Sequence, residues 1–269
     1  MGNVMRTINL FTIVLLFVLF LSGQASAMKI AAYNIQGCVG TTRGYWEYGL
    51  DFWRYLLPHS SGALHGIADF IKDERIDIAA FSEIEGSSFR GGGIDQPEVL
   101  SRMTELKSHV FFPTHRLLGL GNQGNAIHSR GAILSWKSIR LPGGGEARYL
   151  GVALVQMHEA RTTVMVTHLS LSRSKRILQI ERIARAVMET KGPCLLAGDF
   201  NTNDESELLP IIKNGMRLVE TGKSFPSWRP SRRPDRIFIS REFRVIRGYA
   251  SADVRYSDHL PIVAEVDLH

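Results

Sequence analysis

The sequence predicts an α/β fold of four layers, in which two mixed β-sheets pack face to face and helices cover their outer faces. Three observations lead to this prediction. Apolar runs of strand length recur along the chain, several of them are apolar on both faces, and helical patterns separate some runs but not others. A strand that is apolar on both faces is covered on both sides. Two packed sheets with outer helices cover every strand in this way.

The predicted strands follow one another along almost the whole chain. They occupy residues 29–35, 76–84, 131–136, 148–157, 162–169, 194–200, 236–240 and 261–266. The runs at 148–157 and 162–169 adjoin directly, which favours an antiparallel pair, whereas other runs have a helix between them, which favours parallel pairing. Mixed sheets are therefore expected.

Four helical patterns accompany these strands. Residues 63–75 and 172–190 carry apolar residues at helical spacing, and Gly192-Pro193 ends the second of these patterns. Residues 96–107 follow Asp95, a candidate N-cap. A shorter helix is predicted at 205–212.

The first 27 residues form a separate segment. Arg6 precedes a nearly unbroken apolar run at 10–21, and Ala25 and Ala27 stand where a signal peptidase reads small residues. The run is shorter than the ~20 residues that span a bilayer, so the segment predicts a secretory signal; an uncleaved membrane anchor is the alternative. We expect an exported protein, periplasmic or secreted, without a membrane span once the signal is cleaved.

The rest of the chain, residues 28–269, is expected to be one catalytic domain. Its length suits a single large α/β unit, and no repeat or polar linker divides it. Cleavage of the predicted signal would remove Arg6 and lower the formal net charge from +6 to +5. This modest positive charge suits a polyanionic partner without requiring one. We expect a monomer.

Polar residues collect at the ends of the predicted strands. Asp199 and Asn201 end an apolar run, and strand alternation puts them on one face with Phe200 on the other. Six further residues lie at or near other strand ends: Asn34, Glu83, His168, Asp235, Asp258 and His259. Each has an ordinary explanation alone, because Asp and Asn are frequent in turns. Together they indicate a site.

The chemistry that these residue types share is phosphoryl transfer with a hard divalent cation. Mg²⁺ takes oxygen ligands, which Glu83 and Asp258 could supply. Asp199 could hold or deprotonate an attacking water, with Asn34 and Asn201 as neutral orienting groups. His168 and His259 could donate N–H groups to the developing charge. No zinc-finger spacing, Walker loop or G-x-S-x-G elbow occurs, which argues against acyl transfer and nucleoside-triphosphate binding.

The polar positions fall within motifs of a known superfamily. The motifs are "YNI" (33–35), "SEIEG" (82–86), "GNAIHSR" (124–130), "THLSLSRSKRILQ" (167–179), "GDFN" (198–201), "PDRIF" (234–238) and "SDHLP" (257–261). In order and spacing the chain resembles the endonuclease/exonuclease/phosphatase superfamily, whose deoxyribonuclease I-like members are metal-dependent phosphohydrolases. The resemblance covers essentially all of residues 28–269 and implies the four-layer α/β/β/α sandwich.

The resemblance implies a metal side of the site. Glu83 resembles the main metal-binding carboxylate, with Asn34 beside it and Asp258 near the ion. The cofactor implied is Mg²⁺, with Mn²⁺ possible.

The resemblance also implies a phosphate side. Asp199 resembles the residue that orients or activates the water, and Asn201 is its phosphate-contacting neighbour. His259 resembles the essential histidine held by Asp235, and His168 the second histidine of the deoxyribonuclease and sphingomyelinase branches.

Three positions depart from the family pattern. Ser82 stands where glutamine commonly precedes the metal glutamate, which is expected to alter a hydrogen bond rather than metal ligation. His128 replaces an apolar residue and is expected to be structural or to face substrate. Pro234 replaces an aliphatic residue before Asp235.

The substrate class remains open among phosphate esters. Nucleic acid leads, because Arg229, Arg232 and Arg233 lie in a basic run beside Asp235 and suit a phosphate backbone; a solvated basic loop is the alternative. A phospholipid-headgroup hydrolase of the sphingomyelinase type and an inositol-phosphate hydrolase are the alternative enzymes. A binding protein that keeps the fold without catalysis is a third possibility.

The segment at 43–59 holds six aromatic residues within eleven positions, where the family usually has a shorter connection. It follows Asn34 and must leave from the rim of the site. One interpretation is a helical turn that packs Trp46, Leu50 and Trp53 on the body. The other is a substrate-binding wall that includes Tyr45 and Trp46 and stacks on bases.

The two cysteines, Cys38 and Cys194, are expected to be unpaired even in an oxidising compartment. Asn34 and Asp199 must meet at one end of the sandwich, so Cys38 lies beyond that end. Cys194 lies five residues back from Asp199, about 17 Å at ~3.3 Å per residue. A disulfide requires Cα atoms within about 7 Å.

Overall fold

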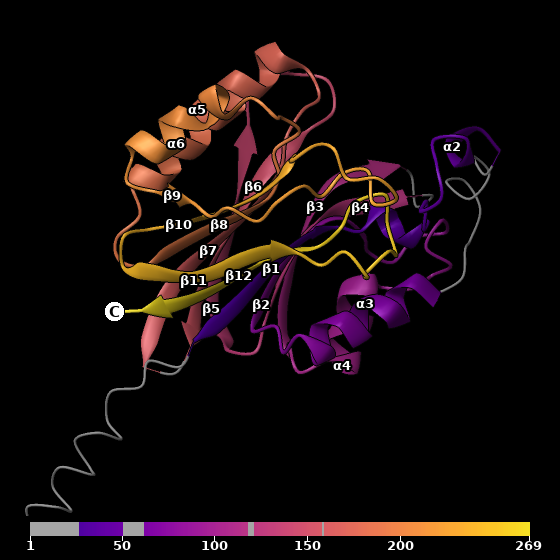
Figure 1. Ribbon diagram of the computed structural model, residues 1–269, viewed down its shortest axis with the longest axis horizontal. Helices are drawn as coiled ribbons and strands as arrows, with labels where there is room; N and C mark the ends of the chain where they lie inside the picture. The colour runs from indigo at the N-terminus through magenta and orange to yellow at the C-terminus, as the bar shows by residue number, and fades with distance from the viewer. Residues whose placement is uncertain (1–26, 51–61, 118–120, 158) are drawn as a thin grey trace, which may run out of the picture.

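Two six-stranded sheets pack face to face in the computed structural model, with helices on both outer faces (Figure 1). The model describes residues 27–50, 62–117, 121–157 and 159–269. The predicted four-layer α/β/β/α sandwich is confirmed. The alternation of helices with strands that are apolar on both faces decides this arrangement.

The first sheet is built around the first strand of the chain. In the order β11-β12-β1-β2-β4-β3, only β1 and β2 run parallel. The bounds are β1 Met28–Asn34, β2 Ile78–Glu85, β3 Ser108–Leu117, β4 Gly121–Ser129, β11 Phe243–Ala250 and β12 Ile262–Leu268.

The second sheet has the order β5-β6-β7-β8-β10-β9, in which only β7 and β8 run parallel. The bounds are β5 Ala132–Leu141, β6 Arg148–Met157, β7 Ala160–His168, β8 Cys194–Asp199, β9 Arg217–Leu218 and β10 Asp235–Ile239. Both sheets are therefore mixed, as predicted.

Each parallel pair is joined through a helix. The helix α3 (Gly62–Asp73) lies between β1 and β2 and packs with α4 (Gln96–Met103) on the outer face of the first sheet. The helix α5 (Arg173–Met188) lies between β7 and β8 and packs on the second sheet with η3 (Glu205–Leu208) and α6 (Leu209–Lys213). Figure 1 shows these two helical layers on opposite sides of the sheets.

The ends of two predicted helices differ from the structure. Asp95 does cap α4, because its side chain accepts a hydrogen bond of 3.1 Å from the backbone N of Glu98. However, α4 stops at Met103, because Thr104 is extended and turns the chain toward β3. The predicted helix at 205–212 is divided into η3 and α6, with Pro210 in the first turn of α6.

Four strands carry no continuous apolar run and were not predicted: β3, β4, β9 and β11. Three of them, β3, β9 and β11, are edge strands, where polar residues are tolerated on the open side. Pro113 lies within β3 at a shift of register, which an edge strand also tolerates. β4 is buried but contains polar residues that belong to the site described below.

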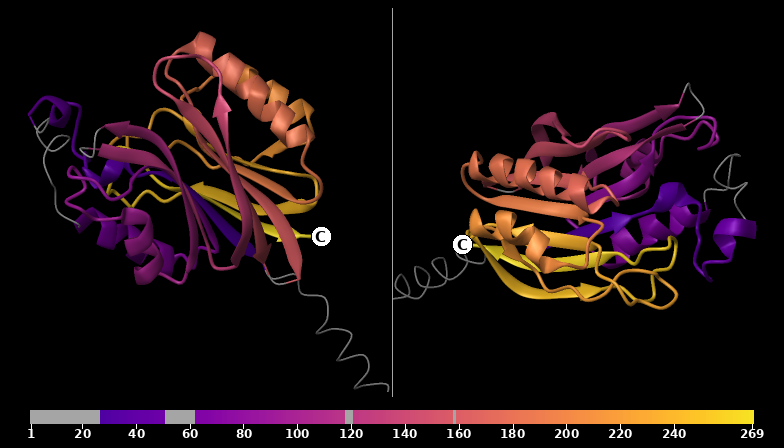
Figure 2. Two further views of the ribbon diagram at one scale, coloured as in Figure 1. Left: turned by 180° about the vertical axis from the view of Figure 1, so that it is seen from behind. Right: turned by 90° about the horizontal axis from the view of Figure 1, so that it is seen from above.

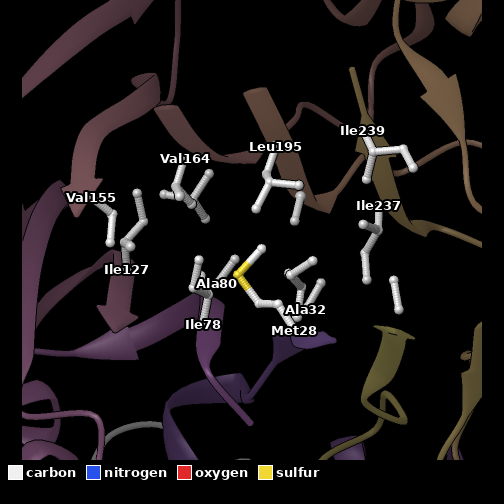
Figure 3. Close-up of a cluster of buried hydrophobic side chains, with 14 of the residues drawn as sticks. Met28, Ala32, Ile78, Ala80, Ile127, Val155, Val164, Leu195, Ile237 and Ile239 are labelled. Atoms are coloured by element: carbon white, nitrogen blue, oxygen red, sulfur yellow. The ribbon is translucent and has the colours of Figure 1, made fainter. Parts of the chain in front are cut away.

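The largest apolar layer fills the space between the two sheets. It contains the inward-facing residues of both sheets, among them Ala32, Ile78, Leu195 and Ile237, which Figure 3 shows meeting from opposite sides. Two further clusters lie between each sheet and its helices. Burial of this apolar surface is the main force that holds the four layers together.

Strand direction brings several strand ends to one end of the sandwich. β1, β2, β7 and β8 finish there, and the antiparallel β10 and β12 begin there. The short helix α2 (Glu47–Leu50) lies at this end, whereas the C-terminus lies at the other (Figure 2). The predicted meeting of polar strand ends is thus built into the topology.

Two further expectations can be compared with the structure. Cys38 and Cys194 are both buried free thiols, so the predicted absence of a disulfide between them is confirmed. Among the described residues, no helix is long and apolar enough to cross a membrane. The proposed signal at 1–27 lies almost wholly outside the described residues.

Candidate active site

The candidate site is the last row of the inter-sheet layer, where inward-facing side chains change from apolar to polar. On β8 the inward positions are Leu195 and Ala197, both in the apolar layer, followed by Asp199. The same alternation brings Asn34 on β1, His168 on β7 and Asp235 on β10 to the inner face. Asp199 is paired in register with both His168 and Asp235.

Glu83 reaches this row through a β-bulge. Ala79 and Phe81 face outward on β2, so simple alternation would turn Glu83 outward as well. Instead the register with β4 shifts between Phe81 and Ile84, and Glu83 adopts a left-handed φ of 56°. Ile84 then takes the outward position and Glu83 is free to face the site.

Asn34 joins the two sheets at this point. Its Nδ2 donates to Glu83 Oε1 at 3.0 Å and to Asp199 Oδ2 at 3.1 Å. Its Oδ1 accepts a hydrogen bond from the backbone N of Gln36 at 3.1 Å. Gln123 on β4 also donates to Glu83, at 3.3 Å to Oε2. Asn34 therefore orients one carboxylate from each sheet.

His259 and Asp235 form a buried pair. Nδ1 of His259 lies 2.7 Å from Oδ2 of Asp235, which also accepts a hydrogen bond of 2.5 Å from Ser224. Burial alone would lower the pKa of His259, but the carboxylates of Asp235, Asp199 and Asp258 together raise it well above its usual value. These carboxylates therefore favour the imidazolium form of His259, whose other nitrogen, Nε2, lies 3.9 Å from Asp199 Oδ2.

Asp199 lies between the two histidines. Its Oδ2 is 3.6 Å from Nε2 of His168 and 3.9 Å from Nε2 of His259. The histidines differ in charge, because burial and the nearby Arg148 lower the pKa of His168 to about 3 in spite of Asp199. The pKa values of the two imidazoles that face this carboxylate are thus shifted in opposite directions.

Asn201 follows Asp199 in a left-handed conformation with φ of 51°. Its backbone N donates to Asp199 Oδ1 at 2.8 Å, and its Nδ2 donates to the carbonyl of Leu169 at 2.9 Å. Asn201 also lines a cavity of about 170 Å³ with Phe225, Arg232 and His259. Phe200 turns to the outer cluster, as alternation predicts.

Asp258 is held on both carboxylate oxygens. Oδ1 accepts from Ser257 at 3.0 Å, and Oδ2 accepts from the hydroxyl of Tyr48 at 2.5 Å. Burial and the carboxylates of Asp258 and Asp199 raise the pKa of Glu83, against the hydrogen bond from Asn34 and the charge of His259. Three carboxylates therefore converge on one region.

A divalent cation fits this surplus of negative charge. Asp199, Asp235 and His259 offer ligand atoms within 4.8 Å of one another, a group that could hold a metal. Binding of an ion by His259 would require the neutral imidazole, which the neighbouring carboxylates disfavour. Glu83, which is 28% exposed and surrounded by neutral donors, is the carboxylate that an ion can reach from solvent.

The predicted substrate contacts lie around this end of the molecule. Arg232 lines the cavity beside His259, and Arg229 is exposed on the same loop. Arg233 is paired with Glu220 at 2.7 Å, so its charge is already compensated. Tyr45 and Trp46 are 57% and 52% exposed.

The packing interpretation of the aromatic segment is wrong for two of its residues. Trp46 is half-exposed and Leu50 is 70% exposed, so neither packs on the body. Trp53, the third residue of that interpretation, lies outside the described residues.

The three departures from the motif pattern have separate explanations. Ser82 donates from its hydroxyl to the carbonyl of Thr167 at 3.4 Å and so bridges the two sheets. His128 is fully buried against α4, with Nε2 at 2.9 Å from the carbonyl of Pro97, and is structural. The carbonyl of Pro234 accepts from the backbone N of Phe200 at 2.8 Å.

Sequence reasoning missed several residues that contact the predicted ones. They are Gln123 beside Glu83, Ser224 beside Asp235, and Tyr48 and Ser257 beside Asp258. Ser257 lies inside the "SDHLP" motif and could have been found there. The other three lie in segments without a strand-end signal.

Comparison with known proteins identifies the family of the chain and supports its fold. The model of the Endonuclease/Exonuclease/phosphatase family matches residues 31–259. No curated protein matches the chain.

Several solved structures share the fold. An endonuclease/exonuclease/phosphatase from Beutenbergia cavernae is 21% identical, with a TM-score of 0.70 over 90% of this chain and 72% of that one. A mannosyl-6-phosphatase from Bacteroides thetaiotaomicron is 15% identical, with a TM-score of 0.66 over 89% and 99% of the two chains. D. rerio TDP2 complexed with a single-strand DNA product is 18% identical, with a TM-score of 0.66 over 90% and 99%.

Proposed function

The chain belongs to the endonuclease/exonuclease/phosphatase family, whose members are metal-dependent phosphoesterases, and from this premise we propose that it hydrolyses phosphodiester bonds in nucleic acid with Mg²⁺. The observation that carries the proposal is that Glu83, Asp199 and His259 meet although they come from three distant segments. Asn34 donates hydrogen bonds to both Glu83 and Asp199. His259 lies 3.9 Å from Asp199 and is held by Asp235.

In the proposed reaction, Asp199 holds the attacking water and accepts its proton as the new P–O bond forms. The P–O bond to the leaving oxygen breaks, and solvent protonates that oxygen. Its Oδ1 is oriented by the backbone N of Asn201 and its Oδ2 by Asn34. His259 donates its free N–H to the charge that develops on the phosphate oxygens, and Asp235 fixes its ring. Neutral His168 is a second N–H donor on the same side, and Asn201 faces the phosphate.

Glu83 would hold the divalent ion, with Asn34 and Asp258 beside it. When bound, the ion supplies Lewis-acid polarisation of the phosphate. Mg²⁺ is preferred in the proposal because the available donors are hard oxygens and because the ion keeps waters when few protein ligands are present. Mn²⁺ should substitute for it.

Nucleic acid is the proposed substrate class because cationic and aromatic side chains surround the site. Arg229 and Arg232 are exposed beside it, and Tyr45 and Trp46 offer accessible rings. D. rerio TDP2, with its single-strand DNA product, shows that the fold accommodates such a ligand. Because the mannosyl-6-phosphatase has the same fold, hydrolysis of small phosphate monoesters should be tested as well.

The test compares the wild type with Glu83→Gln on bis-p-nitrophenyl phosphate, single-stranded and plasmid DNA, RNA, sphingomyelin, inositol phosphates and mannose 6-phosphate. We expect DNA or RNA to be cleaved, activity to be lost with chelator, and excess Mg²⁺ to restore part of the Glu83→Gln activity. Glu105→Gln, which changes an exposed glutamate between α4 and β3 that is paired with Arg130, is the control. Full activity in chelator, or hydrolysis of sphingomyelin alone, would contradict the proposal.

We further propose that residues 1–27 direct export and that residues 28–269 are the mature, monomeric domain. The support is the charge and small-residue pattern of the N-terminal segment. Mass spectrometry of protein recovered from the periplasm or medium should find Met28 at the N-terminus. An intact N-terminus in a membrane fraction would favour an uncleaved anchor. Light scattering would report the oligomeric state.

A further inference from the structure

The segment at 41–50 is held in one conformation by its own hydrogen bonds and contacts the site. Glu47 is buried and accepts hydrogen bonds from the backbone N of Thr42 at 2.7 Å and of Arg43 at 2.8 Å. The side chain of Arg43 adds an ion pair of 2.6 Å to the same carboxylate. The turn is therefore closed around one acid before α2 begins.

This turn reaches the catalytic end of the molecule through two aromatic residues. The hydroxyl of Tyr48 donates to Asp258 Oδ2 at 2.5 Å, across 210 residues of sequence. The ring of Tyr45 stacks on that of Tyr48 at 6.3 Å and meets Trp228 edge to face at 5.1 Å. Tyr45 thus contacts one ring of its own segment and one ring of the distant loop that carries Trp228.

Trp228 is itself connected to Asp258. The preceding residue, Ser227, donates its backbone N to the carbonyl of Asp258 at 2.7 Å and its hydroxyl to the carbonyl of Ser257 at 2.6 Å. The contact between Tyr45 and Trp228 therefore closes a ring of interactions that begins and ends at Asp258.

The outer side of the same segment is an accessible aromatic surface, beside which the charge of Arg43 is compensated by Glu47. Tyr45 and Trp46 are about half-exposed, and the guanidinium of Arg43 lies 5.1 Å from the centre of the Trp46 ring. Flat, accessible rings suit stacking on the face of an unpaired base.

We propose that Tyr48 is a positioning residue that fixes Asp258, and that its segment joins an aromatic subsite for an unpaired base to the catalytic carboxylates. This inference rests on the proposed function. The hydroxyl of Tyr48 selects one orientation of Asp258 beside Glu83. The rings on the outer side of the segment bind a base of the nucleotide next to the scissile phosphate.

The first arm of the test concerns the positioning role. Tyr48→Phe keeps the ring and removes the hydroxyl, and its matched control is Tyr249→Phe, which removes a hydroxyl bonded to Glu74 at 2.6 Å away from the site. Mn²⁺ and Mg²⁺ binding is measured by calorimetry without substrate, together with kcat, KM and the melting temperature. We expect Tyr48→Phe to weaken ion binding about tenfold and to lower kcat with little change in KM. Unchanged ion affinity and kcat would overturn the positioning role.

The second arm concerns the base subsite. The double variant Tyr45→Ala with Trp46→Ala is compared with the wild type on a single-stranded oligonucleotide and on bis-p-nitrophenyl phosphate, which has no base. We expect the ratio of the two kcat/KM values to fall at least about tenfold, as for the loss of one stacked base. An unchanged ratio would overturn the subsite.

The two arms also separate this inference from the proposed function. A wild type that hydrolyses bis-p-nitrophenyl phosphate but no oligonucleotide would contradict the nucleic-acid function and the base subsite together. The calorimetric result for Tyr48→Phe would still decide the positioning role, because it needs no substrate.

Discussion

The interior of the sandwich and the active site occupy the same rows of the same strands, two residues apart. Along β8 the inward side chains are Leu195, Ala197 and then Asp199, and along β10 they are Ile239, Ile237 and then Asp235. The backbone pairing is continuous through both regions, since Asp235 pairs with Asp199 in register as Ile237 pairs with Ala197. Only the side chains change.

This difference shows how the fold separates stability from chemistry. A buried aliphatic side chain contributes about 1.5–3 kcal/mol to folding, whereas a buried carboxylate costs free energy unless it is hydrogen-bonded. Asp199 and Asp235 are each about 1% exposed, and both accept hydrogen bonds from neighbours in the site. The polar row is tolerated because the apolar rows behind it hold the strands in place.

The largest expected effect comes from substitution in the polar row. Asp199→Asn and His259→Ala should each lower kcat by at least ~10²-fold, since they remove a proton acceptor and a charged donor. Both proteins should remain folded, as judged by circular dichroism. Asp253→Asn, an exposed acid near Asp258, serves as control. A nearly normal rate in either variant would place the active site elsewhere.

Substitution in the apolar layer behind the polar row should lower stability rather than impair catalysis. Leu195 is fully buried between the sheets, so Leu195→Ala should lower the free energy of unfolding by about 2–5 kcal/mol. Under conditions in which the variant is folded, its KM should stay close to that of the wild type. Urea unfolding and steady-state kinetics measure the two effects. A loss of activity without a loss of stability would contradict the view that the apolar layer determines stability and the polar row determines catalysis.

A buried polar residue outside the site tests whether burial alone produces pH dependence. Burial lowers the pKa of His128 to about 3, although the carbonyl of Pro97 partly opposes this. The unfolded state therefore binds more protons between about pH 6.5 and pH 3, and stability falls as the pH is lowered through this window. The slope is at most ~1.4 kcal/mol per pH unit.

His128→Gln cannot titrate, so its stability should fall less steeply on acidification than that of the wild type. Urea unfolding at pH 7, 5.5 and 4.5 measures the difference. His65→Gln, on the exposed face of α3, is the control. Parallel curves for His128→Gln and the wild type would show that His128 does not contribute to acid sensitivity.

The smallest expected effect concerns backbone strain. Four of the five non-glycine residues with left-handed φ in the described residues lie at or near the site, Gln36, Cys38, Glu83 and Asn201, and the fifth is Arg75 after α3. Arg75→Gly should raise the free energy of unfolding by about 1 kcal/mol, because glycine adopts this conformation without steric cost. Asn201→Gly should gain less, since it also loses the hydrogen bond to Leu169. An equal gain would mean that this bond contributes nothing.

The sequence predicted the fold and the members of the polar row, but not how each member is oriented. Apolar runs identified eight strands, and strand ends identified Asn34, His168, Asp199 and Asp235. Alternation alone would have turned Glu83 away from the site, because the bulge that redirects it depends on the pairing of β2 with β4. The contact of Tyr48 with Asp258 was also hidden, because no local pattern reports a hydrogen bond between distant segments.

The pairing of β1 with β12 sets the order in which the site can be completed. β1 supplies Asn34, yet its neighbour β12 is the last strand of the chain, and Asp258 and His259 come just before it. Contacts between such distant segments form late, because the entropy of closing the intervening loop must be overcome first. A nascent chain therefore carries Glu83 and Asp199 long before it can cleave anything. Hydrolytic competence appears only when synthesis has reached the final strand.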